Sequence, residues 1–281
     1  MGETNSTETA IPLNAKIGVI KQEFKKRSTK GCFIVSTSET KDQYTVKSYM
    51  REAQETDTKY AHMTTAEKER VFFQKLEKRQ LLSANYAVDI ECEGSDIDDV
   101  YDINSLPSLV DGIPSMNRGG VKNKYVYFGM FGSVFAFHLE DCKLLSVNVH
   151  RGGAIKVWYG IHYEDVDKFL HFVAEHFKNE CNNCETGYLM HKRNFITPDA
   201  LENAGIRYGR VEQDPGTIIL TFPNGIHGGY NLGGNCNEAR NIGTHFWLPY
   251  AKEGLKHSCE EKKKPQAGFS LSKVAVNSKF Q

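Results

Sequence analysis

Two histidines and one glutamate have the residue types and the spacing of a metal site. His138 and Glu140 are separated by one residue at the end of the aromatic segment 124–138. Side chains at positions i and i+2 of a strand point to the same face, so these two can bind one ion. His227 follows another apolar segment and can supply a third ligand. Two imidazoles and one carboxylate leave positions open on Fe(II), where an oxygenase binds its co-substrate and O₂.

The same spacing occurs a second time, at His162 and Glu164. That pair directly precedes a segment with helical periodicity, so we expect it to lie at the solvated start of a helix. Short motifs of this kind have many chance matches. The choice of His138 and Glu140 therefore depends on the residues around them.

Lys156 lies within the apolar segment 154–161. Burying an ammonium group is unfavourable unless an anion meets it. One interpretation is that the stem of Lys156 is buried while the amine reaches water. The other is that the amine binds the distal carboxylate of a dicarboxylate co-substrate whose opposite end chelates the metal.

The pattern along the chain predicts a mainly β fold with flanking helices. Strands are expected at residues 124–138, 143–150, 154–161, 206–212, 217–222 and 241–248. Helices are expected from Thr64 to about residue 82, at 163–180, and briefly after Thr197. Many short strands with one inserted helical hairpin indicate a closed or sandwiched β core. Residues 1–43 contain few large apolar side chains, which predicts a loosely ordered N-terminal arm.

Composition and charge exclude several classes of protein. The 35 Lys and Arg residues balance 35 Asp and Glu residues, so no overall field attracts the chain to nucleic acid. No segment has the length and apolar character of a membrane span, and the N-terminus lacks a secretory pattern. Seven cysteines are an odd number and a poor disulfide framework. We therefore expect a soluble, intracellular protein with reduced thiols.

Five stretches of the chain together resemble a known family. They are NYAVDI at 85–90, KYVYFGMFGSVFAFHLED at 124–141, SVNVHRGGAIKVWYGI at 146–161, MHKRNFITP at 190–198, and ILTFPNGIHGGYNLGGNCNEARN at 219–241. They resemble the JmjC (Jumonji C) family of Fe(II)- and 2-oxoglutarate-dependent oxygenases, and most closely the histone trimethyl-lysine demethylases with JmjN and JmjC parts. Residues 1–43 have no convincing counterpart of the JmjN part.

The resemblance extends over residues 44–260 and implies a domain layout. The core would be a double-stranded β-helix, which is a jelly-roll or cupin-like fold. A mixed helical and strand region at 44–123 would pack on a catalytic core with a zinc site at 124–260. Residues 261–281 would form a polar C-terminal tail.

The resemblance also implies roles for individual residues. His138, Glu140 and His227 would bind iron. The residues expected at 2-oxoglutarate are Tyr86, Phe135, Asn148, Lys156 and Trp158. The residues expected at the methylated substrate are Gly120, Tyr125, Tyr127, Arg240 and Asn241. In the relatives, polarised methyl groups meet carbonyl and hydroxyl oxygens in this pocket.

Arg240 departs from the family pattern. The relatives have small or hydroxylated residues before the pocket asparagine, where this chain has Ala239 and Arg240. A guanidinium inside the pocket would repel a cationic substrate. The side chain either points outward to an acid such as Glu238, which we favour, or fills the pocket and excludes a trimethyl-ammonium group.

Thiols and imidazoles in the last third of the chain predict a second metal site. The expected ligands of a structural zinc are Cys184, His191, His257 and Cys259. The relatives carry zinc at matching places, with a cysteine where this chain has His257. The loop before the site is longer than the family pattern, so Cys181 can replace Cys184.

The activity implied by the resemblance is demethylation of N-methyl-lysine on histone H3, by methyl hydroxylation and release of formaldehyde. Fe(II), 2-oxoglutarate and O₂ would take part, and a methylated histone tail would be the partner of a nuclear, monomeric protein. No sequence-specific nucleic acid and no membrane are expected as partners. A JmjC protein hydroxylase and a catalytically silent chromatin-binding protein are the alternatives.

Overall fold

The computed structural model describes residues 11–81, 83–92, 102–177, 189 and 191–251. The strands are β1 (Lys16–Ile17), β2 (Ile20–Lys26), β3 (Cys32–Glu39), β4 (Tyr44–Thr45), β5 (Ser83–Cys92), β6 (Lys124–Gly129), β7 (Val134–His138), β8 (Leu145–Gly153), β9 (Lys156–Ile161), β10 (Asn194–Ile196), β11 (Tyr208–Gln213), β12 (Ile218–Thr221), β13 (His227–Asn231) and β14 (Asn235–Ile242). The α-helices are α1 (Val46–Thr58), α2 (Thr65–Glu77), α3 (Val166–Phe177), α4 (Pro198–Asn203) and α5 (Leu248–Ala251).

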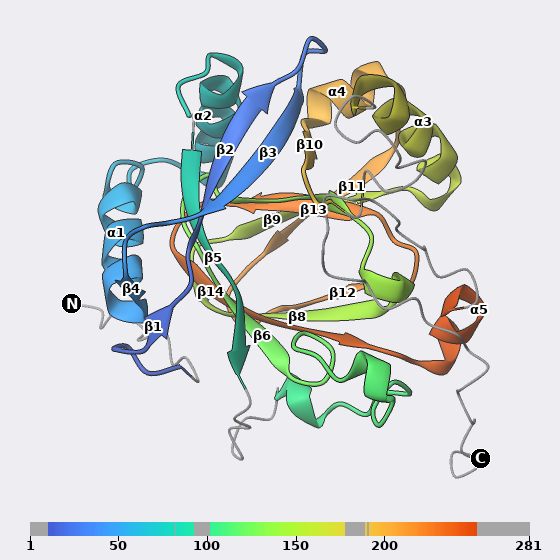
Figure 1. Cartoon of the computed structure of the whole chain (residues 1–281). Helices are drawn as coiled ribbons and strands as arrows, with labels where there is room; N and C mark the ends of the chain where they lie inside the picture. Colours follow the sequence, from blue (N-terminus) through green and yellow to red (C-terminus); the bar gives the residue numbers. More distant parts are fainter. Residues whose placement is uncertain (1–10, 82, 93–101, 178–188, 190, 252–281) are drawn as a thin grey trace.

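Twelve strands form one sheet in the order β11-β9-β13-β7-β10-β3-β2-β5-β6-β14-β8-β12. The sheet bends so that β9, β11 and β13 face β6, β8, β12 and β14 across the interior (Figure 1). The Gln213 amide on β11 donates to the side-chain oxygen of Asn148 on β8 at 3.1 Å, which joins the two layers where the sheet nearly closes. The prediction of a mainly β, jelly-roll or cupin-like core with flanking helices is confirmed.

The first two helices begin at capping boxes, in which a side chain and a backbone amide satisfy each other's hydrogen bonds. Thr64 and Glu67 form the box that the sequence predicts for α2. The helix ends at Glu77, sooner than expected, because Arg79 has the left-handed backbone conformation. Phe72 and Leu76 on α2 are buried in the largest apolar cluster of the described residues.

The N-terminal part of the molecule differs from the loosely ordered arm predicted for residues 1–43. Residues 20–39 form β2 and β3 near the middle of the sheet, where β2 pairs with β5 and β3 pairs with β10. Residues 32–35 on β3 are fully buried. The solvent-facing polar residues of β2 and β3 lower the average hydrophobicity of this segment. The average therefore does not reveal the short buried stretch at residues 32–35.

The glycine-rich segment around His227 forms the hairpin of β13 and β14, where the sequence indicated turns. A side chain at Gly229 would meet the carbonyl oxygen of Val157 at 2.0 Å, so glycine lets β13 approach β9 closely. The strand predicted at residues 241–248 is wrong beyond Ile242. The chain there turns into η7 (His245–Trp247) and α5, because the indole of Trp247 donates to the Cys142 carbonyl and anchors a small apolar cluster.

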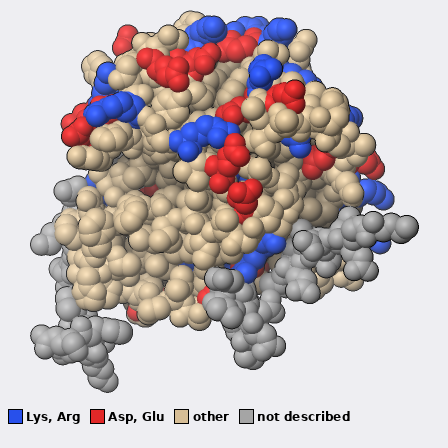
Figure 2. Space-filling view, turned by 180° about the vertical axis from the view of Figure 1, so that it is seen from behind, with Lys and Arg blue, Asp and Glu red and all other residues tan. Residues whose placement is uncertain are grey.

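Charged side chains of both signs are interspersed on the face shown in Figure 2, without a large area of one sign. This distribution agrees with the formal net charge of zero. Among the described residues, no helix combines the length and hydropathy that a membrane span requires.

Candidate metal and co-substrate site

Strand pairing brings the two predicted histidines together. His138 ends β7, His227 begins β13, and the two are direct partners in the antiparallel ladder. Glu140 follows β7 after one residue and starts the short helix η3 (Asp141–Lys143). Residues 89 positions apart in the chain therefore meet at one end of the sheet.

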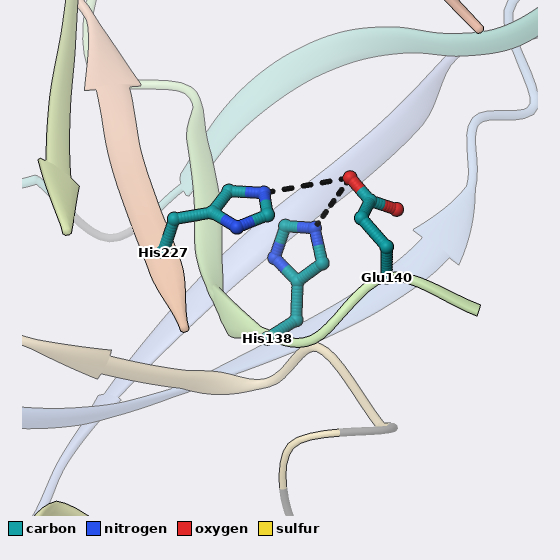
Figure 3. Close-up of side chains that lie close together, drawn as sticks. All are labelled: His138, Glu140 and His227. Carbon is teal, nitrogen blue, oxygen red and sulfur yellow. Dashed lines mark ion pairs between the residues drawn. The ribbon is translucent and has the colours of Figure 1, made fainter. Parts of the chain in front are cut away.

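The three side chains converge on one point (Figure 3). The Oε1 atom of Glu140 lies 3.4 Å from Nε2 of His227 and 3.7 Å from Nε2 of His138. Within the described part of the chain, this is the one group of ligand-type side chains close enough to hold a metal ion. The second H-x-E pair behaves as expected, because His162 caps η4 (Tyr163–Asp165) on the surface, with its ring nitrogen accepting from the amide of Glu164.

Backbone carbonyls fix the tautomer of both histidines. Nδ1 of His138 lies 2.8 Å from the carbonyl oxygen of Ala136, and Nδ1 of His227 lies 3.0 Å from that of Gly225. Each Nδ1 therefore carries the proton and donates, which leaves the Nε2 lone pair pointing to Glu140. Two lone pairs and a carboxylate oxygen that face one another are stabilised by a cation between them, and this nitrogen and oxygen set suits Fe(II).

The protonation states at this point favour a metal. Burial lowers the pKa of His138 to about 4, so its imidazole is neutral at pH 7. Burial opposes ionisation of Glu140, but the neighbouring imidazoles and the positive charge of Lys192 hold its pKa well below the usual range. The site thus offers neutral nitrogen and anionic oxygen, as metal binding requires.

Lys156 is buried among aromatic rings at the start of β9. Its Nζ atom lies 4.5 Å from the ring centre of Phe135 and 5.2 Å from that of Trp158, and donates to the hydroxyl of Tyr86 at 3.5 Å. The side chain is 3% exposed, and among the described residues no carboxylate forms an ion pair with it. Burial lowers the pKa of Lys156 to about 7. A buried ammonium of this kind is stabilised when an anion binds beside it.

A second set of polar groups borders Glu140. The Asn241 side chain donates to Oε2 of Glu140 at 3.1 Å, and its backbone amide donates to the carbonyl of Gly120 at 2.7 Å. The hydroxyl of Tyr127 donates to Asp89 at 3.1 Å. The Tyr125 ring packs so closely under Gly120 that a side chain at this glycine would meet it at 2.7 Å.

Comparison with known families decides what kind of domain holds these residues. Residues 125–242 match the family described as "JmjC domain, hydroxylase". Residues 125–242 are therefore similar to a JmjC domain. This family uses Fe(II) and 2-oxoglutarate, and the His138, Glu140 and His227 geometry fits the iron while the buried Lys156 fits a carboxylate.

Curated relatives match the JmjC domain and part of the sequence before it. The chain is 39% identical over 142 residues to the human "Probable lysine-specific demethylase 4F" and to the rat "Lysine-specific demethylase 4D", which in both cases is 50% of this chain. It is 34% identical over 185 residues, 64% of this chain, to the mouse "Lysine-specific demethylase 4B". The matches cover 22%, 28% and 17% of these relatives, so the chain spans a minor part of their length.

Arg240 is not brought to the metal site. Arg240 points to the opposite face of β14 from Asn241, and it pairs with Asp111 in place of the suggested Glu238. Glu238 pairs with Lys124 and Arg151. Of the predicted zinc ligands, His191 is described, whereas Cys184, His257, Cys259 and the alternative Cys181 lie outside the described residues.

Three further residues bear on the site and were not predicted. Gln213 accepts from the indole of Trp158 at 2.8 Å and donates to Asn148. Asp89 receives the hydroxyl of Tyr127, and Lys192 acts on Glu140 through its charge. Gln213 is fully buried at the end of the largely exposed strand β11. No pattern in the sequence of β11 indicates that this glutamine is buried. Asp89 and Lys192 lie inside the stretches that resemble the family, so the resemblance could have pointed to them.

Proposed function

We propose that the chain is an Fe(II)- and 2-oxoglutarate-dependent dioxygenase that demethylates N-methyl-lysine on histone H3, by hydroxylating a methyl group and releasing formaldehyde. The observation that carries this proposal is the convergence of the His138, His227 and Glu140 ligand atoms within a JmjC domain. The names of the curated relatives, lysine-specific demethylases, support methylated lysine as the substrate residue.

His138, Glu140 and His227 would hold the iron. When bound, ferrous iron activates O₂ with electrons that 2-oxoglutarate supplies, and succinate and CO₂ are formed. The residues keep the metal in place, because Ala136 and Gly225 orient the imidazoles and Asn241 orients the carboxylate.

Lys156 and Tyr86 would bind the distal carboxylate of 2-oxoglutarate, and Phe135 and Trp158 would enclose its carbon chain. Gln213 holds the indole of Trp158 in place by accepting its N–H. It also donates to the side-chain oxygen of Asn148, which leaves the Asn148 amide group free to donate to the co-substrate.

The methylated ammonium would lie against oxygen atoms of Gly120, Tyr127 and Glu140. A Tyr127 hydroxyl that donates to Asp89 keeps its lone pairs for polarised methyl groups, and the Gly120 carbonyl is held by Asn241. Tyr125 supports the backbone at Gly120. In this proposal the protein acts as a monomer in the nucleus, binds a histone tail, and reads no nucleic acid sequence.

Mass spectrometry of trimethylated histone H3 peptides tests the proposal. The peptides are incubated with the protein, Fe(II), ascorbate and 2-oxoglutarate, and Glu140→Gln serves as the inactive control. Loss of a methyl group with formation of formaldehyde is the expected result. A stable gain of one oxygen atom would identify a hydroxylase, and an unchanged peptide without succinate formation would identify a silent binding protein.

A further inference from the structure

We infer that Arg240 is a positioning residue that holds residues 102–121, here called the pocket segment, against β14 and so fixes the Gly120 carbonyl beside Asn241. The inference deepens the proposed function and rests on it, because Gly120 is one wall of the proposed methyl-lysine pocket. It assigns a role to the one residue that departs from the family pattern at this strand.

The guanidinium of Arg240 is buried, with 2% of the residue exposed, and within the described part of the chain its hydrogen bonds go to the pocket segment. Its hydrogen bonds run from Nε to the carbonyl of Val121 at 2.8 Å, from Nη1 to the carbonyls of Ile103, Asn104 and Leu106 at 3.1, 2.9 and 2.8 Å, and from Nη2 to Asp111 at 2.7 Å. One side chain thus ties together both ends and the middle of the segment. A planar group with five donors is suited to this task.

Successive residues on β14 connect this tie to the metal site. Side chains of neighbouring residues on a strand point to opposite faces. Arg240 therefore holds the pocket segment on the outer face, while Asn241 donates to Glu140 on the inner face. The Asn241 backbone amide, between the two, donates to Gly120 of the pocket segment at 2.7 Å.

A second contact supports the same arrangement. Arg118 on the pocket segment forms an ion pair of 3.1 Å with Asp141, the residue after Glu140. The pocket segment therefore borders the proposed metal ligand from two directions, through Asn241 and through Asp141. Loss of the Arg240 contacts would leave Gly120 to these two ties and to other bonds of the segment, such as the one from the Leu109 amide to the Gly243 carbonyl at 2.8 Å.

The same geometry resolves the conflict between an arginine and a cationic substrate. The charge of Arg240 is neutralised by Asp111 and by three carbonyl dipoles at Nη1, on the face of the strand away from Glu140. A residue with a small side chain at this position would deprive those carbonyls of the guanidinium as a donor. Arginine thus shapes the pocket without entering it.

Arg240→Met and Arg240→Lys in the full chain test the inference, with Arg207→Met as the matched control. Arg207 also forms short ion pairs, with Asp165 and Glu164, but it is exposed and does not contact the pocket segment. Arg240→Met should raise the KM for the methylated peptide at least about tenfold, because several hydrogen bonds to a charged group are lost. Arg240→Lys should recover part of the affinity, and succinate formation without peptide should stay within about twofold of the parent.

Hydrogen exchange supplies a readout that needs no turnover. In Arg240→Met the amides of the pocket segment should exchange faster, while those of β9 and β13 should keep their protection. Unchanged exchange there, or a peptide KM that rises no more than in Arg207→Met, would overturn the inference. An equal loss of 2-oxoglutarate affinity in Arg240→Met would also overturn it, since that indicates general damage. A parent without demethylase activity would contradict the proposed function, and the exchange result would still decide whether Arg240 holds the segment.

Discussion

The side-chain amide of Asn241 donates to Oε2 of Glu140, while Oε1 of the same carboxylate faces both imidazole nitrogens. The two oxygens therefore have separate tasks. One is oriented by a neutral amide, and the other faces the position proposed for the metal. An outer partner of this kind adjusts the affinity of a metal site without being a ligand.

Asn241→Ala should weaken Fe(II) binding by about 10- to 100-fold, because Glu140 loses the donor that orients it. Anaerobic calorimetry with Fe(II) measures the change. Asn203→Ala, at the exposed end of α4, is the control and should bind Fe(II) as the parent does. Equal affinities of Asn241→Ala and the parent would contradict the role given to this amide.

His138→Ala should abolish Fe(II) binding and 2-oxoglutarate turnover, since the metal loses a neutral nitrogen ligand. His162→Ala should leave both unchanged, because His162 caps a surface helix. Metal content and succinate formation are measured in parallel for the two variants. The assignment of the H-x-E pair fails if the outcomes are reversed.

Lys156→Ala should raise the KM for 2-oxoglutarate strongly. Removing one partner of a buried charge pair costs about 3–5 kcal/mol. Lys168→Ala is the control, because Lys168 is an exposed residue of α3 that donates to the carbonyl of Gly205, just after α4. Calorimetric titration that finds the parent's affinity in Lys156→Ala would rule out the proposed carboxylate contact.

The affinity for 2-oxoglutarate should fall as the pH rises. Burial lowers the pKa of Lys156 to about 7, so above that pH the free protein carries a neutral amine that does not attract a carboxylate. Affinity should therefore be highest below about pH 7 and fall by up to about tenfold for each further pH unit. Anaerobic titrations between about pH 6 and 9 measure this slope. A flat profile, or the same slope in Lys156→Ala, would refute the assignment to Lys156.

The zinc site stays a prediction. One zinc atom per chain should be found beyond the iron site, bound by Cys184 or Cys181 with His191, His257 and Cys259. Removal of the zinc should unfold the C-terminal part, because formation of such a site is coupled to folding. Elemental analysis of protein purified without chelators measures the zinc content, and a metal-free result would contradict the prediction.

Residues with a strong local pattern were predictable from the sequence. Thr64 and Glu67 have the spacing of a capping box, and Thr197 with Pro198 marks the start of α4. The two H-x-E pairs could be separated because one of them precedes a helical repeat. These features depend on neighbours in the chain, which the sequence displays directly.

Other features depend on residues far away in the chain. Val121 and Asp111 lie more than a hundred residues from Arg240, so its orientation could not be read from the neighbouring Ala239 or Glu238. Likewise, the sequence around His227 indicated turns, because a glycine such as Gly229 is a local turn signal. In the fold, Gly229 lies within a strand and makes room for the Val157 carbonyl. Such placements follow from the whole fold and not from a local pattern.

The position of β2 and β3 inside the sheet affects how the domain can be shortened for expression. A fragment beginning at Tyr44 would keep every proposed ligand of the iron but lose the strands that β5 and β10 pair with. The unpaired backbone groups of β5 and β10 could then form hydrogen bonds with strands of other molecules, which leads to aggregation. A soluble fragment that holds the proposed iron site therefore has to begin before Ile20.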